Sequence, residues 1–126
     1  MEIDEPDDLY GLPLEEFTAA RNALAKSLED EGRADEAGRV KKLKKPPVSA
    51  WAVNQLARQE PAEVARLLDL VDRLREARSA ADIQALGARR RELVAKLTRR
   101  AGELAVAAGH AASQTTLQRV TQTLQA

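Results

Sequence analysis

A short stretch that follows two prolines carries the side chains best suited to recognition chemistry. The segment KKLKKPPVSAWAVNQLAR, residues 41–58, contains the only tryptophan of the chain. On a helical wheel one face of this segment carries Trp51, Asn54, Gln55 and Arg58. An indole beside amides and a guanidinium can anchor a protein interface or stack on a nucleic-acid base. Because tryptophan is highly buried on average, a position in the core is a third interpretation.

Two clusters of basic residues, at 39–45 and 89–100, could contact phosphate groups. The candidate phosphate-contacting residues are Lys41, Lys42, Lys44, Lys45, Arg89, Lys96 and Arg100. The last three fall within about 40° of one another on a helical wheel and form a stripe. Such a stripe can follow a phosphate backbone. The other interpretation is a solvated helix flank that faces the acidic N-terminal segment.

The residues that catalysis needs do not occur in any recognisable spacing. His110 is the only histidine, there is no cysteine, and the six glycines are scattered rather than grouped into a phosphate-binding loop. A metal site of nitrogen and sulfur ligands needs several such residues together. We therefore expect no catalytic residue, no bound metal and no cofactor, and we expect that the protein is not an enzyme.

Composition favours an all-α protein. About a third of the residues are charged, the formal net charge is zero, and the apolar residues are mainly Ala, Leu and Val with one Phe, one Tyr and one Trp. Alanine, leucine, arginine and glutamate are strong helix formers. The first residues are acidic, unlike the positive start of a signal peptide, and no apolar run is long enough to cross a bilayer. These features predict a cytoplasmic protein without a membrane span.

The apolar spacing predicts five to six helices after an acidic lead-in at residues 1–12, in a single helical domain at 13–126. The expected helices cover residues 13–31, 34–44, 48–59, 61 to a tight SAAD connection at 79–82, 83–109 and 113–126. Pro61 fits a first helical position and Gly32 a helix end, while Ser113 fits an N-cap.

Two long helices joined by a short connection predict an antiparallel hairpin at about residues 61–108, within a helical bundle. Arg90 lies in the apolar stripe of the second hairpin helix, so we expect it to pair with Asp69 or Asp72 on the first. The last helix, at about 113–126, is poor in apolar residues. It therefore indicates a chain that continues further or a helix that docks on a partner.

Residues 8–58 resemble a known group of sequences. DLYGLPLEEFTAARNALAKSL followed by KKPPVSAWAVNQLAR resembles the opening of a family of uncharacterised small all-helical proteins of actinobacteria and other GC-rich bacteria. The helices up to about residue 110 share only its general composition. The resemblance implies helical structure and longer relatives, and it implies no activity.

Together these patterns favour a non-enzymatic helical interaction module, either a homo-oligomer or a regulator that binds a protein partner. Its candidate interaction surface is the face that carries Trp51. The alternative is a DNA- or RNA-binding protein that uses the basic clusters at 39–45 and 89–100. Acidic residues placed among the basic ones would favour the interaction module, because they repel phosphate.

Overall fold

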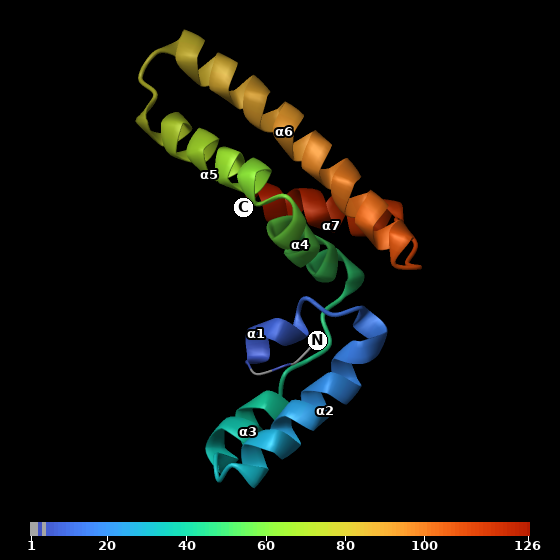
Figure 1. The fold of residues 1–126 in the computed structure, drawn as a ribbon. Coiled ribbons are helices and arrows are strands. Elements are labelled where there is room, and N and C mark those ends of the chain that lie inside the picture. The colour runs from blue at the N-terminus through green and yellow to red at the C-terminus, as the bar shows by residue number, and fades with distance from the viewer. Residues whose placement is uncertain (1–2, 4) are drawn as a thin grey trace. The chain divides into compact units, whose positions relative to one another are not determined.

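The prediction of an all-α protein is confirmed. The computed structural model describes residue 3 and residues 5–126, and this part of the chain contains seven helices and no strand. The helices are α1 (Pro6–Leu9), α2 (Leu14–Asp30), α3 (Ala34–Lys41), α4 (Val48–Gln59), α5 (Pro61–Glu76), α6 (Ala80–Ala107) and α7 (Gln114–Gln125) (Figure 1).

Contacts group the chain into two units, residues 1–51 and residues 52–126, with the boundary inside α4. The single domain predicted at residues 13–126 and the packing of the helices into one bundle stay predictions. Each unit is described separately below.

The first unit is built on α2 and α3, which pack against each other. Its core consists of Leu9, Leu12, Phe17, Leu24, Ala25, Leu28, Ala37 and Val40. The turn between the two helices depends on Gly32, whose φ of 79° is in the left-handed region that glycine adopts readily. The Arg33 N–H donates to the Leu28 carbonyl at 2.8 Å, so the last carbonyls of α2 are satisfied in a Schellman motif.

The acidic lead-in at residues 1–12 contains a structured segment that the sequence pattern did not predict. Residues 6–9 form α1, where the side chains of Glu5 and Asp8 make a capping box. Leu9 is fully buried and Leu12 nearly so, and Tyr10 packs its ring on Phe17 with 5.6 Å between centroids. Two leucines three residues apart therefore hold this acidic segment on the core of the first unit.

Arg21, which the sequence places between apolar residues of α2, is satisfied by backbone rather than by a carboxylate. Its Nη1 donates to the Leu43 carbonyl at 2.9 Å, and its Nε donates to Asn22 Oδ1 at 3.2 Å. Leu43 lies in the non-helical segment before Pro46 and Pro47, because α3 ends at Lys41 rather than at residue 44 as expected. The arginine thus ties that segment to α2.

The second unit contains α5, α6 and α7. Figure 1 shows α5 and α6 lying alongside each other, and they pack together, as do α6 and α7. Pro61 begins α5 as predicted, and Ser113 caps α7 by accepting from the Thr116 N–H. Gly102 allows α7 to approach α6 closely, because a Cβ there would lie 3.1 Å from the Leu117 side chain.

Two details predicted for the second unit are wrong. The connection between α5 and α6 is residues 77–79 rather than SAAD at 79–82, because Ser79 accepts from the Asp82 N–H and begins α6. Arg90 contacts neither Asp69 nor Asp72. Its Nη2 donates to the Gln125 carbonyl at 2.6 Å, near the end of α7, where a cation also complements the helix dipole.

Candidate groove between α5 and α6

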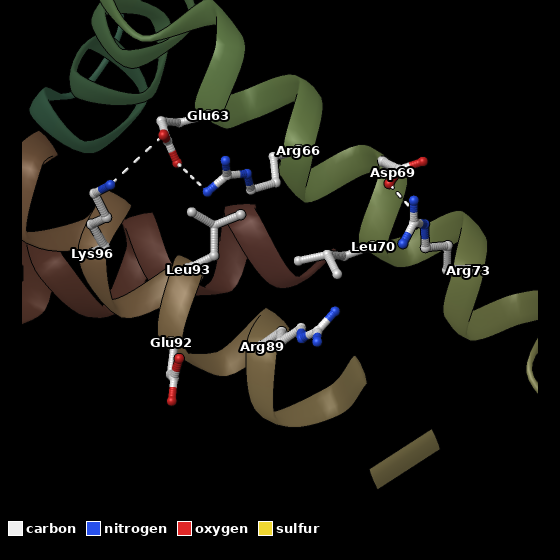
Figure 2. Close-up of a pocket in the computed structure, with 9 residues that line it drawn as sticks. All are labelled: Glu63, Arg66, Asp69, Leu70, Arg73, Arg89, Glu92, Leu93 and Lys96. Carbon is white, nitrogen blue, oxygen red and sulfur yellow. Dashed lines mark ion pairs between the residues drawn. The ribbon is translucent and has the colours of Figure 1, made fainter. Parts of the chain in front are cut away.

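A groove of about 460 Å³ lies between α5 and α6 in the second unit. We call it the α5–α6 groove. It is lined by Glu63, Arg66, Asp69, Leu70, Arg73, Arg89, Glu92, Leu93 and Lys96. Figure 2 shows the two leucines between charged side chains that come from both helices. Its volume is within the range of sites that hold a ligand or a few side chains of a partner.

The spacing along each helix explains how these residues reach one groove. Both helices contribute an arginine, a leucine four residues later and a base seven residues later. On α5 these residues are Arg66, Leu70 and Arg73; on α6 they are Arg89, Leu93 and Lys96. Residues at such spacings share one helix face, and seven residues span about 10.5 Å along the axis.

Glu63 is the carboxylate that links the two helices. Its Oε1 lies 3.7 Å from Lys96 Nζ on α6, and its Oε2 lies 3.9 Å from Arg66 Nη1 on α5. The Oε2 atom is buried and accepts no hydrogen bond in the described part of the chain. One carboxylate is therefore shared between two cations, and it neutralises neither of them fully.

The remaining charges leave the groove with a positive excess. Arg73 Nε lies 3.0 Å from Asp69 Oδ2 one turn earlier on the same helix. Arg89 makes no ion pair with any residue that the structure describes. Figure 2 shows the Glu92 carboxylate directed away from the α5 side chains. Four cations line the groove against three carboxylates, which gives a surplus of one positive charge.

The basic residues predicted to contact phosphate are divided between the two units. Lys41 pairs with Glu29 in the first unit. In the second, Lys96 pairs with Glu63, and Arg100 contacts Glu60 at 3.1 Å and Glu103 at 3.3 Å. The side chains of Lys42, Lys44, Lys45 and Arg89 are exposed. Carboxylates thus lie among the basic residues of both clusters.

The predicted face on α4 is largely covered. Trp51 is buried, and its Nε1–H donates to the Leu12 carbonyl at 2.9 Å within the first unit. Gln55 is also buried, Asn54 is half-buried and Arg58 is exposed. The core interpretation of Trp51 agrees with this burial, and the role of the four residues in an interaction stays a prediction.

His110 lies just after the end of α6, where its backbone N–H donates to the Ala105 carbonyl at 2.9 Å. The described residues contain no group of three or more His, Cys, Asp or Glu side chains placed to hold a metal ion. Within the same residues no helix combines the length and the apolar character that crossing a bilayer requires.

Arg89 and Lys96 were predicted as functional residues, whereas the residues on the α5 side of the groove were not. The missed signal is a short internal repeat. Residues 66–73 read RLLDLVDR and residues 89–96 read RRRELVAK, so both contain an arginine, an acid, Leu-Val and a base at equal spacing. These two octapeptides supply every residue that lines the groove except Glu63.

A scan against protein-family models, a search of curated proteins and a search of solved structures each found no match to this chain. The resemblance of residues 8–58 to the actinobacterial family stays a prediction.

Proposed function

We propose that the chain is a non-enzymatic helical interaction module that associates with another protein chain, either a copy of itself or a partner that it regulates. The observation that carries this proposal is the placement of carboxylates among the basic residues. Lys96 and Arg100, which belong to the predicted phosphate-contacting stripe, both pair with acids of α5 or its N-cap. A phosphate backbone would have to displace or approach those carboxylates, which is unfavourable.

Exposed apolar side chains support a protein partner in addition. Leu68 on α5 is 62% exposed, and Ile83 and Val106 on α6 are 48% and 60% exposed. Single exposed apolar residues are ordinary on a protein surface. These three side chains lie outside the lining of the α5–α6 groove, where Leu70 and Leu93 lie between charged side chains. Protein interfaces combine an apolar centre with a polar border in the same way as this groove.

Light scattering over a range of protein concentrations, combined with titration of fluorescent duplex DNA, tests the proposal. We expect either a mass that rises with concentration or a monomer that binds helical peptides, and weak DNA binding in both cases. If self-association uses α5, Leu68→Ser should reduce it, whereas Ala65→Ser, at another exposed position of the same helix, should not.

A monomer that binds no peptide, and that binds DNA with an affinity falling about a thousandfold between 50 and 200 mM salt, would contradict the proposal. That result would favour the nucleic-acid alternative, with residues 39–45 and 89–100 as phosphate contacts.

A further inference from the structure

We infer that the α5–α6 groove binds an acidic amphipathic helix of a partner protein, with two carboxylates seven residues apart on either side of a leucine-like side chain. This inference rests on the proposed function and names the class of partner. It is carried by the repeated pattern on the two walls, by the charge surplus and by the leucines between the charged rims.

The repeated pattern sets the spacing of the ligand. Arg66 and Arg73 are seven residues apart on α5, and Arg89 and Lys96 are seven residues apart on α6. Each pair therefore spans about 10.5 Å along its helix. An incoming helix has the same rise per residue, so carboxylates at positions i and i+7 lie on one face and match this span. Binding of an amphipathic helix in a groove between two helices is a common recognition mode.

The leucines specify what lies between the two carboxylates. Leu70 and Leu93 follow the first cation of each wall by four residues and lie between the charged side chains in Figure 2. An apolar side chain at position i+4 of the partner would meet them. A polar side chain there would lose its hydration without gaining a hydrogen bond.

The charges of the groove indicate that the partner carries negative charge on its binding face. Arg89 has no ion pair among the described residues, while Arg66 and Lys96 share the single carboxylate of Glu63 at 3.9 and 3.7 Å. Carboxylates of a partner can complete these incomplete pairs. The same feature disfavours a second copy of this chain, since its α5 wall has no net charge and its α6 wall would bring a net positive charge against the surplus already present.

The test uses the full chain and three fluorescently labelled helical peptides of equal length. Fluorescence anisotropy at low salt measures the binding of each peptide. The first peptide carries Glu at i and i+7 with Leu at i+4, the second has the same composition in scrambled order, and the third carries Lys in place of both Glu residues. We expect binding of the first peptide only. Arg89→Glu should weaken it about tenfold or more, because an attractive contact becomes repulsive.

Arg99→Glu is the matched control, because it makes the same charge change at an exposed position of α6 outside the groove. It should leave the affinity within about twofold of that of the unmodified chain. Arg89→Glu should in addition gain binding of the lysine peptide. A variant that had merely lost its fold would show no such gain, and circular dichroism checks its helix content.

Equal binding of the ordered and scrambled peptides, or an equal effect of Arg89→Glu and Arg99→Glu, would overturn the inference. If no acidic peptide binds but the chain self-associates or binds another kind of peptide, the inference fails while the proposed function stands. If duplex DNA competes for the groove and depends on the same arginine, both fail in favour of nucleic-acid binding.

Discussion

Replacing Trp51 separates its role in the fold from a role in association. The indole is buried and donates its N–H to the Leu12 carbonyl at 2.9 Å. Trp51→Phe keeps a ring but removes the donor, and leaving a buried carbonyl without a partner costs about 1–3 kcal/mol. Trp51→Ala removes the ring as well and should cost about 3–5 kcal/mol, as other truncations of large core residues do.

These losses are large beside the total free energy of unfolding of a typical domain, about 5–15 kcal/mol. Urea unfolding followed by circular dichroism measures them without relying on the tryptophan signal. Gln59→Ala, at an exposed position near the end of α4, is the control and should change the free energy of unfolding by less than about 0.5 kcal/mol.

A Trp51→Ala variant as stable as the unmodified chain would show that the indole does not stabilise the core. If that variant also lost its association with another chain, Trp51 would be an interface anchor rather than a core residue. If the variant kept both its stability and every measurable association, Trp51 would be neither an essential core residue nor an interface anchor.

Four further substitutions test local features of the fold. Gly32→Ala should lower the free energy of unfolding by about 1 kcal/mol, because φ is 79° at this position. Gly38→Ala lies inside α3 with open space around its Cβ, so it should raise the free energy of unfolding by about 0.5–1 kcal/mol. Thermal unfolding of the two variants measures the loss and the gain of stability. Ser113→Ala should cost about 1 kcal/mol and speed amide exchange in the first turn of α7. Arg90→Met keeps the apolar stem but removes the donor to the Gln125 carbonyl, so amide exchange should speed up in the last turn of α7 and stay unchanged in α3.

Several helix boundaries could be predicted because local signals fix them. Proline at the first position of α5, serine before α7 and glycine after α2 each satisfy or remove a particular backbone group, whatever the rest of the fold does. The boundary at SAAD failed although the signal was present. Ser79 followed three residues later by Asp82 is a helix start, so the same four residues fit a connection and a helix N-terminus equally well by composition.

Features that depend on tertiary contacts could not be predicted in the same way. The acidic composition of the lead-in concealed Leu9, whose burial depends on the core formed by α2 and α3. The partner of Arg90 is a backbone carbonyl of α7, and periodicity within α6 contains no information about where α7 ends. Half of the groove could be predicted, because the periodicity of α6 groups Arg89 and Lys96 on one face. The α5 half could not, since its place opposite that face depends on how the two helices pack.

We propose above that this chain binds a partner protein through the α5–α6 groove. Two-dimensional NMR of the isotope-labelled chain, titrated with the acidic helical peptide, locates the binding surface residue by residue. We expect shifts of the backbone amides of residues 63–73 and 89–96, with little change at residues 14–30. Shifts concentrated at residues 39–45, or no shift at peptide concentrations that saturate the anisotropy signal, would contradict this proposal.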